Sequence, residues 1–188
     1  TGATAVNAGV LNLQNNTAAG TAAGGVTVAN TAALELQGGI TVGDAFSISG
    51  TGIGSNGVLR NISGTNTISG TVTLAGASTI QSDAGTLTLS GAGNMTGAFG
   101  LTVGGAGNTT ISEVIATTTA AGTLTKIGTG TLTLSGTNTY TGATAVNAGV
   151  LNVQNATALG ATAAGTTVAA GAALEPQGTF AAGAETLS

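Results

Sequence analysis

A long internal repeat constrains this sequence more than any other feature. Residues 1–15, TGATAVNAGVLNLQN, return as residues 141–155, TGATAVNAGVLNVQN, and the two copies differ only at Leu13 and Val153. The likeness continues from residues 27–38 into residues 167–178. We therefore expect residues 1–188 to be a single segment of a longer array, with a unit of about 140 residues and with residues 1–38 equivalent to residues 141–178.

A shorter period runs inside the long one. The heptapeptide GTLTLSG occurs at residues 85–91 and again at 130–136, with GTVTLAG at 70–76 as a relative. Apolar residues at the centres of successive short strands recur about every 23 residues, a spacing typical of solenoid repeats. The pattern predicts one interior column, made of Leu11, Leu34, Leu59, Ile80, Leu101, Leu124, Leu151 and Leu174.

The residues around these positions favour strands. Segments such as residues 10–13 and 86–89 alternate apolar and polar side chains, which is the pattern of a half-buried strand. Similar segments recur in one order, which parallel stacking explains better than the Greek-key pairing of a β-sandwich. The predicted fold is an all-β, right-handed parallel β-helix, or β-solenoid, of about eight coils of roughly 23 residues. Such a rod would be roughly 40 Å long.

Composition excludes several classes of function. Charged residues make up 4% of the chain, and the net charge is −4. Arg60 and Lys126 are its two cationic side chains. No basic patch is available for nucleic acid, and no apolar run is long enough to insert into a membrane as a helix. Cysteine and histidine are absent from the sequence, which removes thiol nucleophiles, histidine triads and most zinc sites. We predict no cofactor.

Residues 124–153, LTKIGTGTLTLSGTNTYTGATAVNAGVLNV, resemble the passenger-associated repeat of Gram-negative autotransporters. The resemblance implies a β-helical passenger that is secreted through the outer membrane by a separate β-barrel and displayed at the cell surface. It does not specify an activity, because such passengers include adhesins, enzymes and plain stalks. The matching positions are Lys126, Gly128, Gly130, Leu132, Leu134, Gly136, Asn138, Tyr140, Gly142, Thr144, Gly149 and Leu151.

The leading functional hypothesis is an extracellular structural or adhesive stalk segment without catalytic activity. Its expected partners are a ligand on a host or neighbouring cell, or copies of the chain stacked end to end. The alternative hypothesis is a subunit of an extracellular filament, sheath or surface layer, in which open solenoid ends form the contact between subunits.

The carboxylates give no sign of a catalytic site, so we predict no catalytic, cofactor-binding or metal-binding residue. Asp44 and Asp83 are separated by a distance along the chain that is not a multiple of the coil length, and we expect them on different faces. Glu35 and Glu175 are equivalent positions of the long repeat and indicate a periodic surface position. All four are interpreted as solvated groups.

Three further motifs favour structure over chemistry. Residues 104–108, GGAGN, carry the glycines of a calcium-binding repeat without its aspartate, and residues 128–130 and 52–54 lack the lysine and helix of a phosphate loop. All three are predicted to be turns. Asn-x-Ser/Thr sequences are no more frequent than this composition produces, and they begin at Asn15, Asn61, Asn94, Asn108 and Asn155.

Threonine pairs spaced by one residue raise the hypothesis of an ice-binding surface, which needs threonines in register on one face. The clearest pairs are Thr71/Thr73, Thr86/Thr88, Thr123/Thr125 and Thr131/Thr133. Their spacings do not follow a coil of about 23 residues. We therefore expect the pairs to scatter around the rod.

Two positions test the predicted register. If Leu34 and Leu59 share a column, then Glu35 and Arg60 point outward on adjacent coils and form a surface ion pair. Pro176 replaces Leu36 of the equivalent repeat and cannot donate to a strand ladder. The last coil should therefore be irregular or lack pairing on one side.

Overall fold

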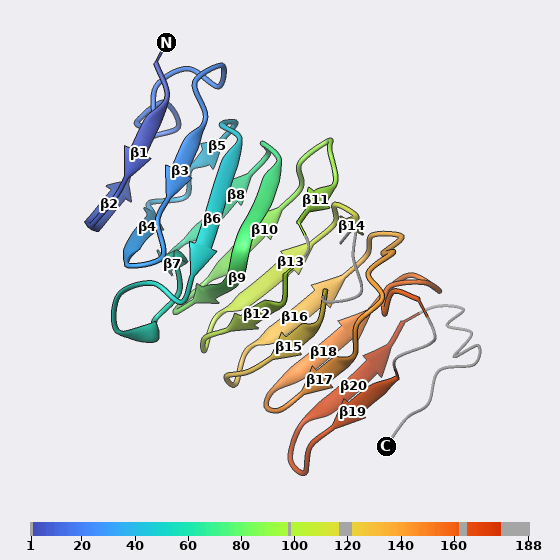
Figure 1. Ribbon diagram of the computed structural model, residues 1–188. Helices are drawn as coiled ribbons and strands as arrows, with labels where there is room; N and C mark the ends of the chain where they lie inside the picture. The colour runs from blue at the N-terminus through green and yellow to red at the C-terminus, as the bar shows by residue number, and fades with distance from the viewer. Residues whose placement is uncertain (1, 98, 117–121, 162–164, 178–188) are drawn as a thin grey trace.

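Parallel pairing joins all neighbouring strands in the computed structural model, which describes residues 2–97, 99–116, 122–161 and 165–177. The chain winds as a β-solenoid of about seven turns, with paired positions about 23 residues apart. Figure 1 shows the strands stacked from β1 and β2 at one end of the rod to β19 and β20 at the other. The single helical element is a 3-10 turn, η1 (Ile53–Ser55), within the described residues. The predicted parallel solenoid is confirmed, and its right-handed sense stays a prediction.

Each complete turn passes three faces in order. β9 (Val72–Ser82) bends at a corner, so its residues 72–74 belong to the first face and its residues 78–82 to the second. The first face also contains β1 (Thr4–Val6), β3 (Val26–Val28), β6 (Phe46–Gly50), β11 (Met95–Thr96) and β14 (Ile115–Ala116).

The other two faces hold the longer stacks of strands. The second face contains, besides β9, the strands β2 (Gly9–Leu13), β4 (Ala32–Gln37), β7 (Leu59–Ser63), β12 (Leu101–Gly104), β15 (Leu124–Lys126), β17 (Thr144–Val146) and β19 (Thr166–Val168). The third face is a separate sheet of β5 (Thr41–Val42), β8 (Thr65–Ile68), β10 (Thr86–Leu89), β13 (Asn108–Ile111), β16 (Thr131–Leu134), β18 (Val150–Val153) and β20 (Ala173–Pro176).

The core is a set of apolar columns that run along the rod axis. Strands such as β10 and β16 alternate buried leucine with outward threonine, so each strand presents one apolar face to the interior. Burying a leucine or isoleucine side chain is worth about 1.5–3 kcal/mol, and no single turn encloses its own residues. On the third face one inward column joins Val42, Ile68, Leu89, Ile111, Leu134 and Val153.

The predicted interior column is correct for its first half and wrong thereafter. Leu11, Leu34, Leu59 and Ile80 do stack on the second face. Leu101 and Leu124 lie on the same face but in the neighbouring column. Leu151 and Leu174 pair with each other on the third face. The true continuation of the column is Val103, Lys126, Val146 and Val168.

The long repeat and the solenoid turn have different lengths, which explains the error. Six turns after Leu11, the residue in the same column is Val146. In the second copy of the sequence repeat, however, the equivalent of Leu11 is Leu151. Each segment of the second copy therefore lies one face further around the solenoid than the same segment of the first copy. Residues 4–13 occupy the first and second faces, and the nearly identical residues 144–153 occupy the second and third.

Pro176 lies where the sequence predicted an interruption. It is exposed at the end of β20, and β20 is an edge strand that pairs only with β18 among the described residues. Proline has no backbone N–H to donate, and at this edge no second described strand requires one.

Candidate functional site

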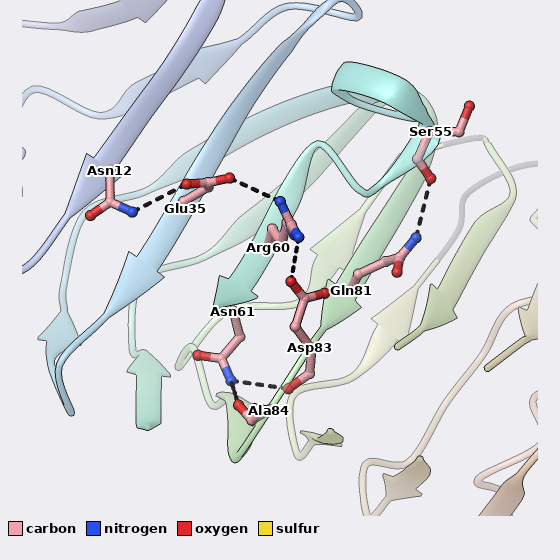
Figure 2. Close-up of polar contacts among 9 residues, drawn as sticks. Asn12, Glu35, Ser55, Arg60, Asn61, Gln81, Asp83 and Ala84 are labelled. Atoms are coloured by element: carbon pink, nitrogen blue, oxygen red, sulfur yellow. Dashed lines mark hydrogen bonds and ion pairs between the residues drawn. The ribbon is translucent and has the colours of Figure 1, made fainter. Parts of the chain in front are cut away.

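A small charged cluster crosses four turns of the second face (Figure 2). Glu35 on β4 pairs with Arg60 on β7, with Oε1 3.2 Å from Nη1, as the register predicted. The other end of the Arg60 guanidinium contacts Asp83, with Nη2 2.5 Å from Oδ2. Asn12 donates its side-chain amide to Glu35 at 3.2 Å. These ion pairs are partly exposed, so each contributes about 0–1 kcal/mol and the cluster acts mainly on register.

The pKa of Arg60 is raised above its ordinary value, first by its hydrogen bond to Asp83 and then by the charges of Asp83 and Glu35, against the opposing effect of burial. The guanidinium is therefore a fixed cation that two carboxylates neutralise. Glu35 and Asp83 are therefore both engaged in ion pairs with this one cation. Glu175 makes no ion pair among the described residues, although it is equivalent to Glu35.

An asparagine network lies beneath the same corner, between the second and third faces. The buried Asn61 donates to Ser82 Oγ at 3.0 Å and to the carbonyl of Ala84 at 2.9 Å. Asn66 donates to Asn61 Oδ1 and accepts from the backbone N–H of Ile40 at 2.8 Å. The network joins neighbouring turns at a corner where the backbone leaves the strand ladder.

Two carboxylates are enclosed, which corrects the interpretation of Asp44 as a solvated group. Asp44 is 2% exposed and Glu113, which the sequence analysis did not single out, is 4% exposed. Both lie at the corner between the third and first faces, where Gly70 stacks on the Asp44 backbone and Gly91 stacks beside the Glu113 carboxylate. Asp44 Oδ1 and both Glu113 oxygens lack a hydrogen-bond partner among the described residues. Burial raises the pKa of Glu113 to about 8.

These two carboxylates do not form a catalytic pair. Three turns separate Asp44 from Glu113 along their corner, which corresponds to about 14 Å of strand stacking. Asp83 lies at the opposite corner beside Arg60, so the expectation that the two aspartates occupy different faces is confirmed. Glycine in the adjacent turn leaves room beside the Glu113 carboxylate, since a Cβ on Gly91 would lie 2.9 Å from Glu113 Oε2.

Lys126 is the second buried charge and occupies a position in the apolar column of the second face. It replaces an aliphatic residue between Val103 and Val146 and is 2% exposed. Burial lowers its pKa to about 8, but three carbonyl oxygens surround the ammonium group. Nζ donates to Ile127 at 2.6 Å, Gly128 at 2.8 Å and Ala148 at 3.2 Å. The lysine thus uses its three donors to join its own corner to the corner of the next turn.

Asn138 and Tyr140 perform a similar role where the first face has no strand, between β16 and β17. Asn138 accepts from the backbone of Ile115 on the preceding turn at 2.9 Å and donates to Ala158 on the following turn at 2.6 Å. The Tyr140 hydroxyl lies 2.7 Å from Thr144 Oγ1 in the interior. Asn138 thus adds side-chain hydrogen bonds to the backbone bonds between these turns, while the Tyr140 hydroxyl bonds within its own turn.

The glycines in this part of the chain are required by close backbone approach. A Cβ atom on Gly130 would lie 1.9 Å from the carbonyl oxygen of Gly107, and one on Gly142 would lie 2.6 Å from that of Gly122. Gly128 has a φ of +70°, which other residues rarely adopt. Glycine therefore forms the corners where successive turns touch.

The surface of the described residues contains no pocket. No group of three potential metal-ligating side chains occurs in the parts of the chain that the structure covers. No described helix has the length and apolar character needed to cross a membrane.

The buried lysine, asparagine and tyrosine and the corner glycines all fall within one family pattern. Residues 124–153 match the model of the passenger-associated transport repeat. This segment is similar to a transport repeat. No curated protein and no solved structure matches the chain. The transport repeat and the solenoid together fit the stalk of an autotransporter passenger, and this repeat family suggests an extracellular or surface-exposed protein.

The expected scatter of the threonine pairs is wrong for two of the four pairs and correct for the other two. The pair Thr131/Thr133 of the transport repeat lies on the third face in register with Thr86/Thr88. Between them is Asn108 with Thr110, and Thr65 with Thr67 lies one turn before. The first members of these four pairs are spaced by one solenoid turn each, a signal that the sequence analysis missed by skipping two of the four turns. The pairs at Thr71/Thr73 and Thr123/Thr125 do lie on other faces.

The glycine motifs lie at or beside bends, and the asparagines of the Asn-x-Ser/Thr sequences differ in exposure. Of the predicted turn at residues 104–108, residues 105–107 form the bend, while Gly104 ends β12 and Asn108 begins β13. Residues 128–130 bend between β15 and β16, and residues 52–54 enter the 3-10 turn η1. Among the Asn-x-Ser/Thr sequences, Asn61 is fully buried, whereas Asn15, Asn94 and Asn108 are exposed or half-buried and Asn155 is half-buried. Asn15 and Asn155 each accept from the backbone and hydroxyl of the threonine two residues later.

Proposed function

We propose that this chain is a structural segment of the stalk of an autotransporter passenger, displayed on a Gram-negative cell and without catalytic activity of its own. The observation that carries the proposal is the direction of the side chains in the transport repeat. Lys126, Asn138 and Tyr140 point inward and bind the chain's own backbone or core, which serves the shape of the rod, so these three side chains are not presented to a ligand.

The proposed partners follow from this role. A stalk holds a ligand-binding part of the same protein away from the membrane, and that part would contact the host or neighbouring cell. Regular parallel stacking suits the role because it offers few sites for local unfolding and proteolysis.

A display experiment tests the stalk. One or two copies of the chain would be placed between an epitope and an autotransporter β-barrel in a Gram-negative host. We expect the epitope to reach the surface and to lie about 34 Å farther out per copy, from about seven turns of about 4.8 Å each. A scrambled sequence of equal composition is the matched control. Protease sensitivity of the displayed chain, or no increase in reach, would contradict the proposal.

End-to-end association of copies is the second proposal. The observation in its favour is that β17 and β18 pair on both sides, whereas β1 and β2, of nearly the same sequence, pair on one side among the described residues. Electron microscopy of the purified chain distinguishes the two proposals. Regular filaments that lengthen with concentration would support a filament subunit, and short isolated rods would support the stalk.

A further inference from the structure

The third face carries an ordered array of small polar side chains that goes beyond the role of a stalk. Its central four strands, β8, β10, β13 and β16, pair without any register shift. Each strand and the residue after it present three outward side chains, so twelve positions form three parallel columns. We name this array of eleven hydroxyls and one amide the hydroxyl grid. In it, Asn108 Oδ1 accepts from the backbone N–H of Thr131 at 3.0 Å. The grid consists of Thr65, Thr67, Ser69, Thr86, Thr88, Ser90, Asn108, Thr110, Ser112, Thr131, Thr133 and Ser135.

The third column follows from backbone hydrogen bonds just past the strand ends. The N–H of Ser90 donates to Ile68, that of Ser112 to Leu89 and that of Ser135 to Ile111. Each serine therefore keeps the same register as the threonines before it. Neighbours in a column are separated by the strand spacing of about 4.8 Å, and columns are separated by two residues, about 6.6 Å.

The hydroxyls of the grid are free to bind solvent in an ordered way. None of its threonine hydroxyls bonds to another described residue, and the two serine contacts, Ser69 to Val42 and Ser112 to Leu89, are long at 3.4 and 3.3 Å. Threonine is stiff at χ1, so stacked threonines hold their methyl and hydroxyl groups in repeated positions. The grid contains no charged side chain, and the column reaches Glu175 only two strands beyond Thr133.

The other faces lack a comparable array among the described residues. On the second face Thr102 pairs with Thr79 and Thr125, but the next outward position on β12 is Gly104. On the first face Thr73 pairs with Ser47 and Thr96, but Ala75 follows it along the strand. Each of these faces has a single column, so the two-dimensional order is particular to the third face.

We propose that the hydroxyl grid binds ice, or water ordered as ice. Oxygen atoms on the faces of an ice crystal repeat at spacings similar to those of the grid, so waters held by neighbouring hydroxyls match positions of the lattice. Each contact is weak, and many of them made at once by a rigid face give lasting adsorption. A polysaccharide is the less suitable ligand, because the grid has neither an aromatic platform nor a concave pocket within the described part of the chain.

Thermal hysteresis and inhibition of ice recrystallisation by the purified 188-residue chain test the proposal. We expect measurable activity in the unchanged chain and a loss of about tenfold or more in Thr88→Tyr and Thr110→Tyr, which place a bulky ring in the middle column. Thr102→Tyr is the matched control, since Thr102 is also an outward, half-buried strand residue. Tyrosine suits strands, and circular dichroism would establish that all three variants fold.

Three results would overturn the proposal. The first is no effect of the unchanged chain on ice at any soluble concentration. The second is an equal loss in the Thr102→Tyr control, which would place the activity elsewhere. The third is binding to insoluble cellulose or chitin that Thr88→Tyr abolishes without any effect on ice, which would make the grid a polysaccharide site. None of these results bears on the reach of the displayed stalk.

Discussion

Glu113 and Lys126 are both enclosed within the rod, but the structure compensates the charge of only one of them. Lys126 keeps a donor on each of three carbonyl oxygens, so its charged form is compensated. Glu113 has no hydrogen-bond partner for either oxygen among the described residues, so its neutral form is favoured.

Glu113 should make stability depend on pH. Burial raises the pKa of its carboxyl from 4.5 to about 8, so the folded chain retains the proton at pH values where the unfolded chain has lost it. Its contribution to stability is therefore fully present below about pH 4.5 and is lost as pH rises through about 8, at up to about 1.4 kcal/mol per pH unit. Glu113→Gln should remove this slope and be more stable than the unchanged chain at pH 9.

Urea unfolding of both chains between pH 4 and pH 9 measures this difference. Glu175→Gln is the control, because it makes the same chemical change at an exposed position of a strand. Parallel pH profiles for Glu113→Gln and the unchanged chain would show that the Glu113 carboxyl ionises normally in the folded state.

At the scale of elements, the corners of the solenoid tolerate larger residues less well than the outward strand positions do. Strand residues alternate between the core and solvent, but corner residues touch the turns before and after them through backbone atoms. At Gly130 an added Cβ would lie 1.9 Å from a carbonyl oxygen, and a backbone atom cannot move aside without shifting a strand.

Gly130→Ala should therefore destabilise the chain by about 1–3 kcal/mol, the usual cost of overpacking. Gly43→Ala is the matched control, since an added Cβ there meets only ordinary contacts at 3.8 and 3.9 Å. Thermal unfolding monitored by circular dichroism compares the two. Equal melting temperatures would mean that the corner at Gly130 relaxes freely.

For the molecule as a whole, stability is shared between neighbouring turns. Each turn contacts the turns before and after it, so a complete turn is an interchangeable unit. Ile80 pairs with Val103 and Gln81 with Gly104, which identifies residues 81–103 as one full turn.

Deletion of residues 81–103 should give a folded rod that is shorter by about 4.8 Å, because Ile80 would be followed by the register equivalent of Gln81. Deletion of residues 81–91 is the control, since it removes about half a turn and places apolar residues on the outside. Circular dichroism and small-angle X-ray scattering would compare the variants. Loss of structure in the full-turn deletion would contradict the additivity of turns.

The sequence by itself determined the architecture and part of its register. Alternation within strands and the spacing of leucines predicted parallel stacked turns of the observed length. The stacking of Leu34 on Leu59 then placed Glu35 beside Arg60. These features depend on neighbouring turns alone, so small errors in spacing do not accumulate. The matched segment at residues 124–153 likewise followed from its own motif.

Only the tertiary structure decided the features that depend on several turns at once. The spacing of paired positions varies from turn to turn, so errors add along the stack, and the predicted column contained Leu151 where Val146 in fact lies. The hydroxyl grid is regular in the sequence, but the pairing of four adjacent strands was needed to show that its rows share one face. The burial of Asp44 and Glu113 was decided at corners, where the turns before and after them lie close, and sequence alternation does not show which turns become adjacent.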